Sequence, residues 1–166
     1  RSCWKSHWIA RCLTQKIEIL GNGLTIMVND KVVSRFTGTP TRENGGIIGK
    51  EPLYPPDEVL DLLDRRSIGA ITLWTNDCQK DVQNLELDHD GVIKLIRNAL
   101  RSGRFLNSQW CQQKPGGPWA ACDAYTVTQA EWIEAAFKSL DIQYYVKFAL
   151  NKSGKLLLVV SCHTSS

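Results

Sequence analysis

Three residues near the C-terminus have side chains suited to acid–base chemistry on a phosphate: Tyr145, Lys147 and His163. A histidine with an unperturbed pKa of about 6.5 can give or take a proton at neutral pH. A lysine ammonium can stabilise the charge of a phosphorane, and a tyrosine can hydrogen-bond phosphate or stack on a base. This combination predicts cleavage of RNA by attack of the ribose 2′-OH, without a metal ion.

The side of the sheet on which these side chains lie depends on how two C-terminal segments pair. In 142–150 the even positions are apolar, so Tyr145 and Lys147 share the polar side. A three-residue turn after this segment would pair Tyr145 near Ser161, and would place His163 on the same face. A turn one residue shorter or longer would turn the second strand over. The alternative is that these are ordinary solvent-facing residues of two strands and a frayed terminus.

Two further polar sets are candidates for RNA binding. Lys94, Arg97, Arg101 and Arg104 recur at helical spacing and could follow a phosphate backbone, although a solvated helix face has the same pattern. The next segment alternates, so that Asn107 and Gln109 share one face with Phe105. Such amides read base edges or position phosphates, and they are equally common on the open side of a sheet.

Helix signals come first along the chain and strand signals gather at the end, which predicts an α+β fold. Asp88 is a strong N-cap candidate for a helix that Gly103 ends, and Thr128–Glu131 has the form of a capping box. The expected helices are 57–67, 77–84, 89–102 and 129–140. The expected strands are 70–74, 104–110, 121–127, 142–150 and 155–163.

The N-terminal part differs in charge and pattern. Residues 1–50 carry eight Lys/Arg and three Asp/Glu, whereas 51–166 carry twelve and fourteen. Residues 16–37 alternate around Gly21-Asn22-Gly23, which predicts β-hairpins, and the Gly/Pro/Thr-rich stretch 37–49 is a candidate linker. We therefore expect a basic β-hairpin extension with its linker over 1–50, and the main domain over 51–166.

Composition excludes several classes of protein. With 43% hydrophobic and 22% charged residues the chain is in the globular range, and it has no apolar run long enough to span a membrane. The six cysteines form no C-x-x-C pair and the histidines lack zinc spacing, so no metal site or cofactor is expected. Cys3 with Cys12, or Cys111 with Cys122, could form disulfides, but free packed thiols are favoured.

The order of short motifs over 55–163 resembles the MqsR (motility quorum-sensing regulator) mRNA interferases, toxins with a RelE-like fold. The matching stretches are EVLDLL, DVQNLELDHDGVIKLI, FLNS, DAY, YYVKF and LLLVVSCH. The resemblance covers about two thirds of the chain and implies a small antiparallel sheet with helices packed on one face. It also implies a ribonuclease neutralised by a cognate antitoxin.

The resemblance assigns the family's catalytic tyrosine to Tyr145 and its following lysine to Lys147. The active-site lysine of the family's F-Y-K-S strand falls on Asn107, the glutamine before D-V-Y on Cys122, and the terminal lysine on His163. These three positions have changed residue type, which leaves the cleavage preference and the activity open. The DAY stretch adds Asp123 and Tyr125 to the candidate RNA-binding residues.

Three hypotheses follow. The leading one is a metal-independent endoribonuclease toxin that acts in the cytoplasm on single-stranded RNA and is neutralised by an antitoxin or immunity protein. One version of this hypothesis has the toxin delivered as part of a larger secreted polypeptide. The second is a catalytically inactive RelE-like module that binds protein or nucleic acid, which Asn107 in place of lysine favours. The third, weaker, is an enzyme with Cys122 or Cys162 as nucleophile beside His163.

Overall fold

The computed structural model describes residues 15–19, 25–29 and 31–165, and these residues form an α+β fold. Three α-helices and a six-stranded sheet make up the main body, and β1 and β2 form a separate two-stranded sheet. The elements are β1 (Gln15–Ile19), β2 (Thr25–Asn29), η1 (Glu43–Gly46), β3 (Ile47–Gly49), α2 (Pro56–Arg66), η2 (Ser67–Ala70), β4 (Ile71–Leu73), α3 (Asn76–Asn84), α4 (His89–Ser102), β5 (Arg104–Gln112), β6 (Trp119–Ile133), η3 (Glu134–Ala136), β7 (Lys138–Leu150) and β8 (Leu157–Thr164).

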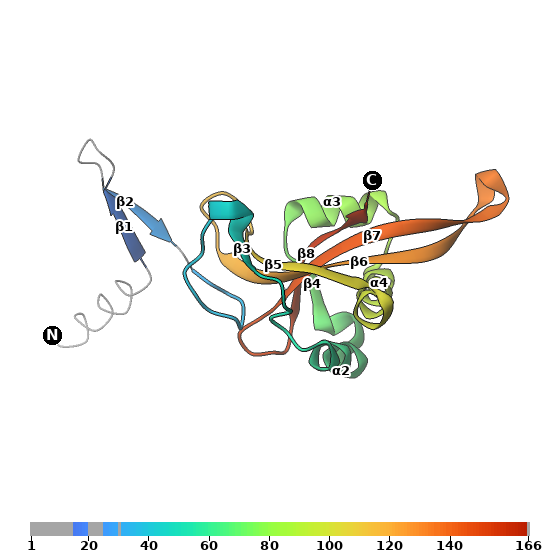
Figure 1. Cartoon of the computed structure of the whole chain (residues 1–166), viewed down its shortest axis with the longest axis horizontal. Coiled ribbons are helices and arrows are strands. Elements are labelled where there is room, and N and C mark those ends of the chain that lie inside the picture. Colours follow the sequence, from blue (N-terminus) through green and yellow to red (C-terminus); the bar gives the residue numbers. More distant parts are fainter. Residues whose placement is uncertain (1–14, 20–24, 30, 166) are drawn as a thin grey trace.

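The main sheet has the strand order β3-β5-β6-β7-β8-β4 (Figure 1). Strands β5 to β8 follow one another as an antiparallel meander, whereas β4 pairs in parallel with β8. The sheet is therefore mixed rather than wholly antiparallel. Tyr125, Phe148 and Cys162 point to the side on which the helices pack, and they belong to the main hydrophobic core.

Three of the four predicted helices are present, each within one residue of its predicted bounds. The Asp88 carboxylate accepts a hydrogen bond from the Gly91 N–H at the start of α4, and α4 buries a stripe that includes Ile93 and Ile96. The Thr75 hydroxyl caps α3 through the Cys78 N–H. A helix with one buried stripe needs a surface to cover, and the meander provides that surface.

The helix predicted over 129–140 is wrong, because these residues form the end of a β-hairpin. Strands β6 and β7 pair over eleven positions, from Asp123 with Phe148 to Ile133 with Lys138. The hairpin extends beyond the rest of the sheet as an arm (Figure 1), and at its end Phe137 is 80% exposed. The capping-box pattern describes local preference only, and continued pairing with β7 satisfies the same backbone groups.

Residues 31–49 join the main body instead of linking two domains. The Val33 N–H donates to the Trp119 carbonyl and the Arg35 N–H to the Leu150 carbonyl, so this segment fills the gap where β6 and β7 diverge. Strand β3 pairs with β5 at the edge of the sheet. The predicted linker therefore contributes a strand to the sheet.

The predicted N-terminal hairpin is present as β1 paired antiparallel with β2. Its Gly21-Asn22-Gly23 turn, together with Cys3, His7 and Cys12, lies outside the described residues. None of the helices in the described part of the chain is long and apolar enough to cross a membrane.

Candidate active site

Two rows of mostly polar residues cross the face of the sheet that lies opposite the helices; we call the two rows together the polar face. Strand register aligns the first row across four strands: Arg104, Thr126, Tyr145 and His163. The second row lies beside it: Asn107, Ala124, Lys147 and Ser161. Paired residues of neighbouring antiparallel strands project to the same side of a sheet, so the register itself brings these side chains together.

Tyr145 and His163 are in direct contact. Their rings stack with centroids 5.0 Å apart and an angle of 18° between planes. His163 is exposed, and its Nδ1 lies 3.0 Å from the Thr164 carbonyl oxygen. A carbonyl can only accept, so this contact favours the tautomer with the proton on Nδ1. The Nε2 atom then keeps its lone pair and is available as a base.

A β-bulge in β8 places His163 on this face. Next to the loop, Leu150 pairs with Leu157 and Phe148 with Val159, but Lys147 pairs with Ser161. The extra residue in β8 restores the alternation that the loop length had reversed, because each one-residue shift turns a strand over. Tyr145 therefore pairs with His163 itself, two residues from the predicted register but on the predicted face.

Lys147 lies in the second row, next to the stacked pair of Tyr145 and His163. Its Nζ is 5.4 Å from the centre of the Tyr145 ring, within the range of a cation–π contact. Burial acts to lower the pKa of Lys147, but the negative charge available on Cys111 and on Tyr145 outweighs it, and the pKa is raised. The ammonium form is therefore kept, as an electrostatic role requires.

The two amides of β5 lie on the polar face, but Phe105, predicted on the same face, lies on the helix side against Tyr125, because β5 is bulged between Phe105 and Asn107. Asn107 pairs with Ala124 and so belongs to the second row, and Gln109 pairs with Cys122 and lies beside that row. The Asn107 Oδ1 atom is buried and has no hydrogen-bond partner among the described residues. A buried acceptor without a partner is costly, and a bound hydroxyl or amino group would relieve that cost.

The four basic residues predicted to follow a phosphate backbone lie in different environments. Arg97 forms an ion pair with Asp64 of α2 at 2.8 Å. Lys94 and Arg101 are exposed on α4, which packs against the other face of the sheet. Arg104 lies beyond the end of the helix, in β5, and is the one of these four residues that lies on the polar face.

Asp123 and Tyr125 lie on the helix side of the sheet and are buried. The Asp123 carboxylate accepts hydrogen bonds from the Leu53 and Tyr54 N–H groups and from the Ser108 hydroxyl. The Tyr125 ring stacks on Phe148. Their surroundings give these residues a structural role, and we leave both out of the candidate site.

The two candidate nucleophilic cysteines are poorly placed for attack beside His163. Cys162 pairs with Val146 and so points to the helix side, and burial raises its pKa to about 11. Cys122 is fully buried, and burial raises its pKa as well. The four described cysteines, Cys78, Cys111, Cys122 and Cys162, are free thiols.

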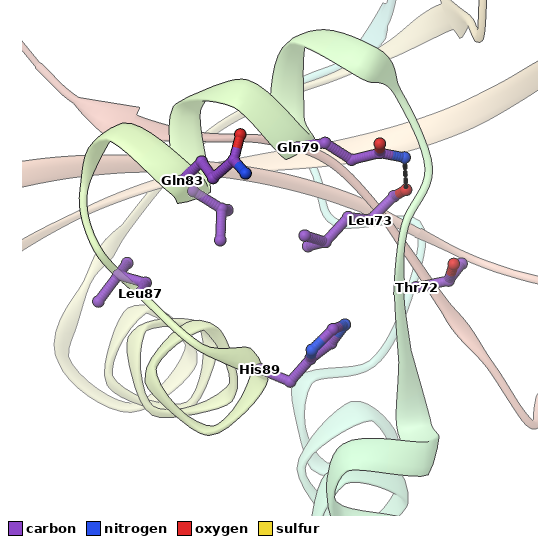
Figure 2. Close-up of a pocket in the computed structure, with 7 residues that line it drawn as sticks. Thr72, Leu73, Gln79, Gln83, Leu87 and His89 are labelled. Atoms are coloured by element: carbon purple, nitrogen blue, oxygen red, sulfur yellow. Dashed lines mark hydrogen bonds between the residues drawn. The ribbon is translucent and has the colours of Figure 1, made fainter.

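A separate pocket of about 480 Å³ lies away from the polar face, between β4, α3 and the start of α4 (Figure 2). His89 and Gln83 lie at its edge, and the Gln79 side chain donates to the Leu73 carbonyl. Sequence reasoning missed this pocket, because its residues come from three elements with no shared motif. Within the described residues no group of three His, Cys, Asp or Glu side chains could hold a metal ion.

Comparisons with known proteins give no relative for this chain. No family model, no curated protein and no solved structure matches it.

Proposed function

We propose that this protein is a metal-independent endoribonuclease whose active site is the polar face. The stacked pair of Tyr145 and His163, with Lys147 behind it, is the observation that carries the proposal. Cleavage through the 2′-OH needs a base, a group that stabilises the phosphorane and a proton donor for the leaving oxygen. The polar face offers one residue for each task on adjacent strands.

In the proposed reaction, His163 Nε2 removes the proton of the 2′-OH. The oxygen then attacks the adjacent phosphorus, and Lys147 and Arg104 stabilise the negative charge that gathers on the phosphorane. The Tyr145 phenol donates a proton to the departing 5′-oxygen. The products are a 2′,3′-cyclic phosphate end and a 5′-hydroxyl end.

Single-stranded RNA is the substrate that suits this face. The first row crosses four strands, and at a strand spacing of about 4.8 Å its ends are about 14 Å apart. The row carries Arg104 at one end and presents aromatic rings at the other. Unpaired bases can stack on such rings, whereas a duplex keeps its bases covered.

Incubation of the purified full chain with single-stranded RNA in EDTA tests the proposal. We expect cleavage that stops when the nucleotide at the scissile bond is 2′-deoxy. His163→Gln and Tyr145→Phe should each lower the rate by about 100-fold or more, the usual contribution of acid–base catalysis. His89→Gln, at an exposed histidine in the separate pocket, should cleave like the wild type. Full activity of the His163→Gln variant would overturn the assignment.

A second candidate is a module of the same fold that binds RNA or protein without cleaving. Asn107 in place of a lysine, and a Lys147 that is half-buried beside thiols, favour it. Tight RNA binding with no cleavage, unchanged in His163→Gln, would select this function. In either case we propose that the protein acts in the cytoplasm, and that a cognate antitoxin or immunity protein restrains the toxin form.

A further inference from the structure

A second pocket, of about 410 Å³, lies beside the loop after β7 and shares no residue with the polar face. Its walls come from four parts of the chain: residues 31–33, the residue that follows β4, the loop 151–153 and β8. The lining residues are Lys31, Val32, Val33, Trp74, Asn151, Lys152, Ser153 and Leu158. A cavity of this volume is in the range that holds a small-molecule ligand.

Hydrogen bonds hold the walls of this pocket in place. The Trp74 N–H donates to the Val159 carbonyl, and the Trp74 carbonyl accepts from the Gln113 side chain, both at 2.8 Å. Asn151 fixes its own loop, because its Oδ1 atom accepts from the backbone N–H groups four and five residues further along the chain. The pocket is therefore formed without a ligand, and binding needs little ordering of the protein.

The charged residues of the pocket are both lysines. Lys31 and Lys152 are exposed, and the lining contains no Asp or Glu. Neither lysine forms an ion pair within the part of the chain that the structure describes. Two unpaired ammonium groups favour an anion, and together they match the charge of about −1.5 to −2 on a phosphate monoester at pH 7.

The remaining lining provides an apolar wall with one aromatic residue. Val33 and Trp74 are half-buried against the main hydrophobic core, and Leu158 is buried. A planar base can pack against such a wall, and tryptophan accepts any base because every base has an aromatic face. An inorganic anion would leave this wall unused, and an uncharged ring would leave the lysines unused.

We propose that this pocket binds a nucleoside monophosphate, with the phosphate between Lys31 and Lys152 and the base against Trp74. The nucleotide is either free or the phosphorylated end of an RNA chain, since both present the same groups. The inference stands on the pocket alone and does not need RNA cleavage on the polar face, so each can fail without the other.

Isothermal titration calorimetry of the full chain with AMP, adenosine and inorganic phosphate tests the proposal. We expect AMP to bind about 10-fold or more tighter than adenosine or phosphate, because only AMP uses both the lysines and the apolar wall. A 5′-phosphorylated dinucleotide without a 2′-hydroxyl at its internal bond distinguishes the two sources. Binding as tight as that of AMP indicates the end of an RNA chain, and weaker binding indicates a free nucleotide.

Lysine replacements test which groups hold the phosphate. Lys31→Met and Lys152→Met should each weaken AMP binding by about 5-fold, the loss of one exposed charge pair, and leave adenosine binding unchanged. Lys152→Arg should keep most of the affinity because it keeps the positive charge. Lys138→Met is the matched control, since it removes an exposed lysine of the arm, and it should bind AMP like the wild type.

The location of the nucleotide is tested against the polar face. His163→Gln should bind AMP as tightly as the wild type, and circular dichroism of each variant shows that the fold is retained. AMP binding that is lost in His163→Gln but unchanged in Lys31→Met and Lys152→Met would place the nucleotide on the polar face and overturn the proposal. Equal affinity for AMP and adenosine, or no binding of AMP at millimolar concentration, would also overturn it.

Discussion

At the scale of single residues, Asp123 shows how a buried carboxylate organises the fold. It holds the backbone of Leu53 and Tyr54 against β6 and also accepts from the Ser108 hydroxyl. We expect Asp123→Ala to lower the free energy of unfolding by about 3 kcal/mol, because two buried N–H groups lose their acceptor. Urea unfolding measures the loss. Asp61→Ala, at an exposed i,i+4 ion pair, should change it by less than about 1 kcal/mol.

Asp123 also predicts how the free energy of unfolding depends on pH. Burial raises the pKa of Asp123 above its ordinary value of 3.8, more than its hydrogen bonds lower it. The folded protein then binds this proton more tightly than the unfolded chain. Its contribution to stability is therefore complete below the unfolded pKa and decreases as the pH rises through the folded pKa. The stability difference between wild type and Asp123→Ala should narrow as the pH rises from below the unfolded pKa of Asp123 through its raised folded pKa; a widening difference would contradict the raised pKa.

At the scale of elements, the junction of α4 and β5 is constrained by close backbone contact. A Cβ atom at Gly103 would lie 2.5 Å from the carbonyl oxygens of both Ala99 and Thr126. Gly103→Ala should therefore cost about 2 kcal/mol, in the range of overpacked sites. It should also disturb Arg104, the next residue. Gly69→Ala is the matched control, since a Cβ there meets open space, and thermal unfolding compares the two.

The arm of β6 and β7 shows why one predicted element was wrong. Thr128–Glu131 has a good local signal for the start of a helix, and Trp132 and Phe137 are both compatible with a helix after it. Pairing of β6 with β7 continues outward from a sheet that is already formed. Each added residue pair therefore extends an existing hairpin and needs no separate nucleation step. In this segment the neighbouring strand decided the structure, and local preference did not.

At the scale of the whole molecule, residues 31–49 belong to the main body. The Ser34 hydroxyl accepts from the Ala121 N–H, and β3 extends the sheet. We expect a chain of residues 31–166 to melt close to the full chain. A chain of 51–166 should lose at least about 3 kcal/mol, or about 10 °C in Tm, because it leaves β6 and β5 without these partners. Equal melting of the two truncated chains would show that 31–50 are dispensable.

The sequence by itself determined the elements whose signals are local. The cap at Asp88, the stop at Gly103 and the buried stripe of α4 are properties of neighbouring residues, and the structure confirms that helix at its predicted bounds. The alternation of 142–150 likewise placed Tyr145 and Lys147 on one side of a strand. Such patterns depend only on the period of a helix or a strand.

Only the tertiary structure decided how those elements meet. The loop after β7 would have turned His163 to the helix side, and the bulge between its pairing partners Val159 and Ser161 returned it to Tyr145. Register is set by loop lengths, bulges and packing across the sheet, which act between residues far apart in the chain, and no local pattern carries that information.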